Sequence, residues 1–314
     1  MVSIIITSYN NENTIDRAIN SALNQSYQNC EVIVIDDCSN DNSSTIYQEY
    51  GNKIRVYRNE KNEGLPYSRQ VGIHKSHGRF IAFLDADDYL SPHAIQYCMD
   101  NQKTNDADIL QMKISRKIGK FGISLPFYSK YDSSKALDAC LYDEHLFPIQ
   151  CWGKLYKADL LKSTNKLEYS GFWGEDRIFN IPVIASKPTI EIVGNAKYNY
   201  SWGGTSSSNF DINALQEYKQ VYQIKHNWAQ INGYEQFIPM MQKELTELLK
   251  YHIRHLINSN SLSFNNAIEY LQDELEQPFW ASFKLPQARE LYSAEKKSLS
   301  RVLKKSITNL IKQA

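Results

Sequence analysis

The chain has 314 residues, of which 42% are apolar and 22% are charged, a composition typical of a globular protein that can bury a sizeable core. Basic and acidic residues each number 35, so a net positive field for nucleic acid is absent and nucleic acid is not an expected partner. The five cysteines form no CxxC pair, no apolar run is long enough for a membrane span, and Met1 leads directly into a predicted strand, so we expect a cytoplasmic chain without a signal peptide.

Strand and helix patterns alternate along the amino-terminal part of the chain. Short apolar, β-branched runs predict strands, and apolar residues at helical spacing predict the helices between them. The predicted strands are 2–7, 31–35, 54–58 and 79–84, and the predicted helices begin at residue 15 and cover 43–50 and 65–75. This alternation is typical of an α/β fold with a mostly parallel, Rossmann-like sheet flanked by helices.

The pattern changes twice further along the chain. A strand is predicted at 108–115, a helix at 133–142, and a glycine-rich, aromatic and acidic turn opens the apolar segment 171–185. Helical spacing predominates from residue 211, most clearly over 244–257. We therefore predict two domains, a sheet-containing domain at 1–210 and a helical region at 211–314.

Polar or acidic residues stand where three of the predicted strands end: Thr7, the pair Asp36 and Asp37, and the segment 85–88. In parallel sheets, ligands bind beyond these carboxyl ends. Asp85 and Asp87 project to the same side of an extended chain, and a hard divalent cation between them would relieve their repulsion. These two residues are thus candidate ligands for Mn²⁺ or Mg²⁺; a solvated acidic turn is the alternative interpretation.

Two ordered stretches resemble the family 2 glycosyltransferases, which are inverting enzymes of the GT-A fold. They are residues 2–43, VSIIITSYNNENTIDRAINSALNQSYQNCEVIVIDDCSNDNS, and residues 59–95, NEKNEGLPYSRQVGIHKSHGRFIAFLDADDYLSPHAI. Weaker matches follow at WGKLYK and WGEDRIFN. The resemblance covers about residues 1–205 and leaves out the helical carboxyl-terminal third.

The resemblance implies a nucleotide-sugar site at the strand ends. Thr7 and Tyr9 would pack on the base, and Asp37 would accept the hydrogen bond of a uracil N3–H group. Asn62 and Arg69 would line the nucleotide pocket, where Arg69 could also neutralise phosphate; a surface helix cation is the alternative for Arg69. Asp85 would lie near the ribose, with Asp87 as the direct metal ligand.

The resemblance also implies a catalytic base. Inverting transfer needs a group that takes the proton from the acceptor hydroxyl. In the family this group is the aspartate of an acidic pair at a helix start, which here is Asp176, with Glu175 as the second candidate. An ordinary helix cap is the alternative. Family members often carry a cation in the loop that corresponds to 201–206, and here that loop has none, although Arg177 or a carboxyl-terminal lysine is a possible substitute.

The expected function is transfer of a sugar from a nucleotide-diphosphate donor, a UDP-sugar, to a saccharide or lipid-linked acceptor in cell-surface polymer synthesis. The basic amphipathic segment 298–311 could contact a membrane surface, pack internally or join subunits of a homo-oligomer. A nucleotidyltransferase is one alternative, but the turn 8–13 lacks the glycine and lysine of such enzymes. A non-catalytic sugar-binding scaffold is another, but it would be expected to lose the acidic motifs.

Overall fold

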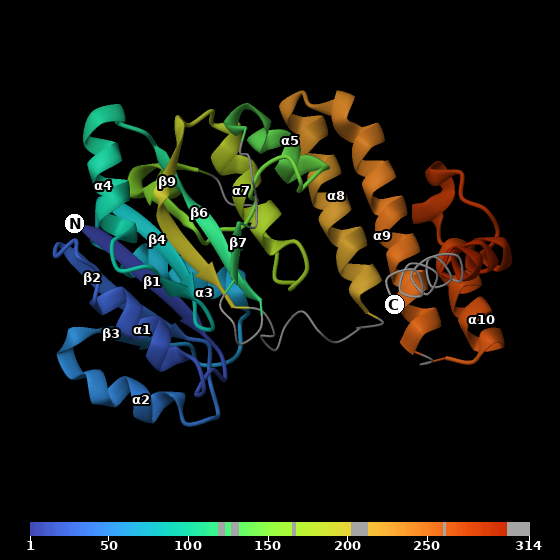
Figure 1. Ribbon diagram of the computed structural model, residues 1–314. Coiled ribbons are helices and arrows are strands. Elements are labelled where there is room, and N and C mark those ends of the chain that lie inside the picture. The colour runs from blue at the N-terminus through green and yellow to red at the C-terminus, as the bar shows by residue number, and fades with distance from the viewer. Residues whose placement is uncertain (119–122, 127–131, 165–167, 202–212, 260–261, 300–314) are drawn as a thin grey trace, which may run out of the picture. The chain divides into compact units, whose positions relative to one another are not determined.

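The computed structural model describes residues 1–118, 123–126, 132–164, 168–201, 213–259 and 262–299. The chain divides into two compact units, Met1–Ser208 and Asn209–Ala314 (Figure 1). The sequence pattern places this division after residue 210. The predicted basic segment 298–311 and the loop 201–206 lie largely outside the described residues.

One mixed sheet organises the first unit. Its described strands follow the order β3-β2-β1-β4-β8-β6-β9-β5, with β7 paired to β6. The first four strands in that order are parallel, whereas β8 is antiparallel to both β4 and β6. The predicted α/β class is confirmed. The strands are β1 (Val2–Ser8), β2 (Cys30–Asp36), β3 (Arg55–Arg58), β4 (Phe80–Asp85), β5 (Tyr89–Leu90), β6 (Ile109–Ile118), β7 (Ile123–Pro126), β8 (Lys154–Lys157) and β9 (Ile190–Tyr200).

Helices cover both faces of the parallel strands. Successive apolar side chains of β1 point to opposite faces, so each face of the sheet has apolar side chains to bury. Ile4 and Ile6 join the core with α1, whereas Ile5 faces α3. Gly72 of α3 allows a close approach, since a Cβ there would lie 2.4 Å from the Ile5 Cγ2. The helices of this unit are α1 (Ile15–Leu23), α2 (Ser43–Tyr50), α3 (Leu65–Lys75), α4 (Ala94–Asn105), α5 (Ala136–Leu141), α6 (Ala158–Ser163) and α7 (Glu175–Ala185).

Several elements differ from the sequence predictions. The predicted helix 133–142 is a 3-10 turn, Ser133–Lys135, followed by the short helix α5. Strands β8 and β9 have no counterpart among the predicted strands, although they complete the sheet beside β4 and β6. The first of them spans only four residues, so it offers too short a stretch for a periodic signal.

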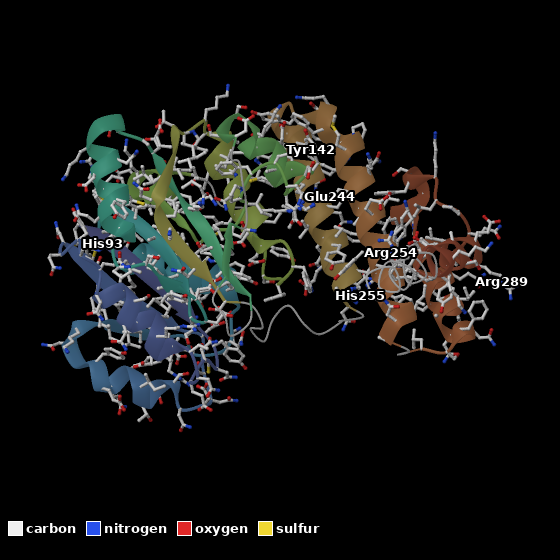
Figure 2. All side chains as sticks on the ribbon, viewed as in Figure 1. His93, Tyr142, Glu244, Arg254, His255 and Arg289 are labelled. Carbon is white, nitrogen blue, oxygen red and sulfur yellow. The ribbon has the colours of Figure 1, made fainter. Side chains whose placement is uncertain are left out.

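The second unit is helical, as the spacing beyond residue 211 predicts. It contains α8 (Ala214–Asn232), α9 (Ile238–Ser259) and α10 (Phe264–Leu275), and Figure 1 shows α8 and α9 running side by side. Lys225 of α8 pairs with Glu244 of α9 at 2.5 Å, and Arg254 pairs with Glu295 at 2.6 Å; Figure 2 labels Glu244 and Arg254. Among the described helices, none has the length and apolarity needed to cross a membrane.

Candidate active site

The polar strand ends gather at one edge of the sheet, as predicted. In the parallel register, Thr7 of β1 is opposite Asp85 of β4, and Ser8 is opposite Asp36 of β2. Thr7 is buried at 8% exposure, whereas the Tyr9 side chain is 45% exposed just beyond the edge. Tyr9 is therefore open to a planar ligand, which agrees with the implied packing on a base.

The loops that follow β1 and β2 are bonded to each other. The Asn10 N–H donates to the Ser39 hydroxyl at 2.9 Å, and the Asn40 N–H donates to the Asn10 side chain at 2.8 Å. Farther out, the Glu12 N–H donates to Asp41, while Glu12 accepts from the Asn42 N–H, both at 2.8 Å. Each loop therefore supplies hydrogen-bond partners of the other, and the two loops hold each other in place.

Asp37 organises a third loop, residues 59–64. Its carboxylate accepts hydrogen bonds from the Asn59 side chain at 2.7 Å and from the N–H groups of Glu63 and Gly64 at 3.0 and 2.8 Å. A carboxylate offers about four acceptor positions, so one remains for a further donor. Asn62 is exposed on this loop. The implied contact of Asp37 with uracil stays a prediction, and the structure adds a role in holding the loop.

Arg69 connects the two acidic clusters of the site. Its side chain is 1% exposed, which rules out the alternative of a surface cation. The Nη1 atom lies 3.0 Å from Asp176 and 3.8 Å from Glu175, while Nη2 lies 3.7 Å from Asp85. Burial opposes its charge, but the acidic groups around it, Cys151, Asp176, Asp85 and Glu175, hold the pKa of Arg69 well above its ordinary value. The implied contact of Arg69 with nucleotide stays a prediction.

Two carboxyl groups beside Arg69 bind protons unusually tightly. Burial raises the pKa of Asp85 to about 7; Arg69 opposes this shift, and Asp87 and Asp176 reinforce it. Burial and the neighbouring Asp176 raise the pKa of Glu175 to about 8 against the effect of Arg69. Shifts of this kind, produced by burial together with a specific charged partner, are typical of functional sites.

Asp176 has the geometry of an oriented carboxylate. Helix α7 begins at Glu175, and its N-cap position is Gly174 at a φ of 83°, with no side-chain cap. The Asp176 carboxylate instead accepts the Cys151 N–H at 2.8 Å and faces Arg69, contacts that differ from those of an ordinary helix cap. The side chain is 16% exposed, which leaves part of it open to a substrate hydroxyl.

The acidic turn after β4 places its aspartates in different settings. Asp85 and Asp87 are partly exposed, and burial raises the pKa of Asp87 while Arg17 opposes that shift. Asp88 is fully buried: its carboxylate accepts from the Tyr198 hydroxyl and the Ser201 N–H, both at 2.7 Å. Burial, Asp85 and Asp87 raise the pKa of Asp88 to about 8. Asp88 thus ties the turn to the end of β9, whereas Asp85 and Asp87 remain the candidate metal ligands.

The donor atoms at the turn suit a hard cation. The Oδ1 atom of Asp85 is buried and faces Nη2 of Arg69 at 3.7 Å, but the Asp85 and Asp87 side chains both remain partly exposed, and carboxylate oxygens are preferred ligands of Mn²⁺ and Mg²⁺. No group of three or more His, Cys, Asp or Glu side chains is assembled for a metal among the described residues. The residues present therefore fit a cation that takes its remaining ligands from diphosphate and water.

Arg17 is a site residue that the sequence interpretation missed. It lies on α1, is exposed, and donates from Nη2 to the Asp87 carbonyl and, at 2.9 Å, to the Ser201 hydroxyl. Its guanidinium also lies over the Tyr89 ring, 5.1 Å from the centroid. Arg177, which the sequence suggested as a substitute cation, instead pairs with Glu144 at 3.1 Å. The helical spacing of α1 marks Arg17 as exposed but carries no signal of what it reaches.

Comparisons with known proteins identify the family of the chain. The family model described as Glycosyl transferase family 2 matches residues 3–162, just over half of the chain. The Staphylococcus aureus poly(ribitol-phosphate) beta-N-acetylglucosaminyltransferase TarP is 25% identical, over 87% of this chain and 86% of its own length. The Bacillus subtilis minor teichoic acid biosynthesis protein GgaB is 28% identical over 80% of this chain, which spans only 27% of GgaB.

Solved structures show the same fold. S. aureus TarS 1-349 in complex with UDP-GlcNAc aligns with a TM-score of 0.59 and 20% identity over 90% of this chain and 79% of that one. The complex of TarS 1-349 with UDP aligns with a TM-score of 0.62 and 18% identity over 97% and 91%. These likenesses confirm the predicted GT-A fold with its helical carboxyl-terminal region. The family match confirms the resemblance seen in the sequence: the chain belongs to glycosyltransferase family 2.

Proposed function

We propose that this chain is an inverting, metal-dependent glycosyltransferase that transfers a sugar from a UDP-sugar to a hydroxyl group of a cell-surface polymer. The observation that carries the proposal is the position of Arg69, which brings the donor-side carboxylate Asp85 and the candidate base Asp176 onto one buried cation. A donor held at the strand ends and an acceptor hydroxyl at Asp176 would then meet at a single point.

The chemistry follows from this arrangement. The acceptor oxygen attacks the anomeric carbon as the bond from that carbon to the diphosphate oxygen breaks, and the hydroxyl proton passes to Asp176. The Cys151 N–H and Arg69 both bind the Asp176 carboxylate, so its orientation is set before the substrate arrives. Asp85 and Asp87 would hold Mn²⁺ or Mg²⁺, which supplies Lewis-acid stabilisation of the departing diphosphate. Arg17, bonded beside Asp87, adds positive charge on the same side.

The relatives narrow the substrates to be tested. TarP is named for transfer of N-acetylglucosamine to poly(ribitol phosphate), and a TarS structure holds UDP-GlcNAc. We therefore propose UDP-GlcNAc as the first donor to test and a polyol-phosphate polymer as the first acceptor. A peripheral membrane contact and a homo-oligomer remain proposals of the same kind.

The first experiment is a thermal-shift screen with UDP, GDP, CDP and dTDP, each with Mn²⁺ and with EDTA. A ligand that binds only the native state raises the melting temperature. A Mn²⁺-dependent shift with UDP alone supports the uracil role of Asp37 together with the metal site. A preference for another nucleotide would overturn the uracil assignment, and the absence of any shift would favour the sugar-binding scaffold.

The second experiment measures release of UDP from UDP-GlcNAc, because a transferase also transfers its sugar slowly to water. Asp87→Ala and Asp176→Asn should each lower the rate by at least about 100-fold. Asp159→Asn is the matched control, since Asp159 also lies in the first turn of a helix, α6, but is exposed. Hydrolysis that survives Asp87→Ala would contradict the metal assignment.

A further inference from the structure

Lys154 is a buried cation that no proposed step has used. It is the first residue of β8, and its side chain is 1% exposed. Among the described residues no carboxylate lies within ion-pair distance of its ammonium group; the Nζ atom instead donates to the carbonyls of Pro148 and Gln150 at 2.8 and 2.5 Å. An ammonium group is costly to bury, so a lysine here must supply something that an apolar residue cannot.

The two carbonyls that Lys154 holds belong to the segment immediately before Cys151. The carbonyl between them, that of Ile149, accepts from the Asn180 side chain at 2.7 Å. Three consecutive carbonyls are thus bound by two buried side chains. The next N–H along the chain is that of Cys151, which donates to Oδ1 of Asp176 at 2.8 Å.

Asn180 joins this segment to the helix that carries the candidate base. It lies one helical turn after Asp176 on α7, and its Nδ2 also donates to the Asp176 carbonyl at 3.0 Å. The Tyr156 hydroxyl of β8 donates to the Asn180 Oδ1 at 3.1 Å. The segment before Cys151 therefore has fixed anchors on β8 and on α7, and its position decides where the Cys151 N–H points.

We infer that Lys154 is a positioning residue for Asp176: it fixes the carbonyls of Pro148 and Gln150 so that the Cys151 N–H orients the Asp176 carboxylate toward the acceptor. This inference rests on the proposed function, in which Asp176 is the base. Burial lowers the pKa of Lys154 to about 8, while Cys151 and Asp176 oppose that shift.

The Cys151 amide gives a direct measurement of this geometry. Selective ¹⁵N labelling of cysteine gives at most five backbone signals, because the chain has five cysteines. Asp176→Asn identifies the Cys151 signal, because its amide proton loses a charged acceptor. In Lys154→Met, the Cys151 signal should move toward its position in Asp176→Asn, while the other cysteine signals stay in place.

Catalysis gives the second measurement. In Lys154→Met, hydrolysis of UDP-GlcNAc should fall by on the order of 10²-fold, the scale of a misplaced catalytic group, while the affinity for UDP with Mn²⁺ stays unchanged. Lys157→Met is the matched control, because Lys157 is in the same strand but its ammonium group binds Asp108 at 2.9 Å. Lys157 is also far from the site along the sheet: it pairs with Phe80, at the opposite end of β4 from Asp85. It should leave both measurements as in the wild type.

A Cys151 signal that stays at its wild-type position in Lys154→Met would overturn the inference, whatever the hydrolysis rate. If that variant does not fold, Lys154→Gln replaces it. The glutamine amide ends one bond short of the lysine Nζ and carries no charge, so it should hold the two carbonyls more weakly, and an intermediate shift and an intermediate rate are expected. A Cys151 signal and a hydrolysis rate that both match the wild type in Lys154→Gln would also overturn the inference. Failure of the proposed function is seen separately, as normal hydrolysis in Asp176→Asn.

Discussion

The Nη1 atom of Arg69 lies 3.0 Å from Oδ1 of Asp176, although the two residues come from different helices, α3 and α7. Arg69 is almost completely buried, so its charge is balanced by carboxylates and not by water. The same guanidinium faces Asp85 at 3.7 Å. A change in the charge of Asp85 or Asp176 therefore alters the electrostatic environment of the other carboxylate.

Replacement of Arg69 by lysine should impair catalysis more than folding. A lysine keeps the positive charge but lacks the planar fork that reaches Asp85 and Asp176 together. We expect Arg69→Lys to lower donor hydrolysis by about 100-fold. Arg69→Ala should destabilise the protein by about 3–5 kcal/mol, because it leaves buried carboxylates without a partner. Denaturant unfolding measures the second effect.

Arg55→Lys is the control for that prediction. Arg55 also pairs with a carboxylate, Glu31 at 2.6 Å, but it lies at the start of β3, away from the carboxyl edge. Its replacement should leave donor hydrolysis unchanged. Equal losses of activity in Arg55→Lys and Arg69→Lys would show that the effect is general and not a property of the site.

The affinity for Mn²⁺ with UDP should rise with pH. Asp85, whose pKa is about 7, must lose its proton to bind a cation, so calorimetry should show tighter binding at pH 8 than at pH 6. The stability of the metal-free protein should change in the opposite direction and fall as the pH rises. Because the folded-state pKa values of Asp85 and Glu175 are raised, their stabilising contribution is greatest in acid and is lost as the pH rises through about 7 to 8.

Thermal melting of the metal-free protein checks this linkage. In Glu175→Gln the fall of the melting temperature between pH 6 and pH 8.5 should be smaller than in the wild type, because one of the responsible groups no longer titrates. Affinity for Mn²⁺ with UDP that is the same at both pH values would contradict the assignment of Asp85 to the metal.

Arg17→Ala should weaken diphosphate binding selectively. Since Arg17 is bonded to the Asp87 carbonyl and to Ser201, its loss removes both a positive charge and a support of the acidic turn. We expect the affinity for UDP with Mn²⁺ to fall about tenfold, with the affinity for uridine unchanged. Arg79→Ala is the control, because Arg79 is also exposed and also lies over a ring, that of Phe80, but at the opposite end of β4. An equal loss for uridine and UDP would place Arg17 at the base instead.

Asp37→Ala should affect both stability and nucleotide choice. The substitution removes the acceptor of two backbone N–H groups and one side-chain amide in the loop 59–64, and unpaired buried donors typically cost about 1–3 kcal/mol. It should also abolish the preference for UDP over CDP in the thermal-shift screen. Retention of that preference would mean that Asp37 only holds the loop.

The sequence predicts most of the parallel part of the fold because β1, β2 and β4 are largely buried and are nearly continuous apolar runs, whereas β3 alternates half-buried and exposed residues. Strand β8 is different: it has only two apolar residues, which stand between two lysines, and only its place between β4 and β6 makes it a strand. Tertiary pairing, which a local pattern does not encode, decides such elements.

The site residues also fall into two groups, those whose positions can be predicted from the sequence and those whose contacts cannot. Asp85, Asp87 and Asp176 stand in recognisable motifs, so their approximate positions follow from the sequence. The contacts of Arg69 and Arg17 do not, because each depends on a partner from a distant element, Asp176 and Asp87, and the contacts of Lys154 depend on the conformation of the irregular segment before Cys151. The packing of helices and strands decides which partner a long side chain contacts. The spacing of residues along one element carries no information about that partner.

The mutual hydrogen bonds between the loops after β1 and β2 have an evolutionary consequence. Asn10 and Glu12 of the first loop are hydrogen-bonded to Ser39 and Asp41 of the second. A substitution in one loop therefore changes how much a substitution in the other loop destabilises the protein. Mutational effects across contacting residues of this kind are not additive. Changes of nucleotide or donor preference on this side of the site would therefore require paired replacements, and the two loops should be inherited, and engineered, as one unit.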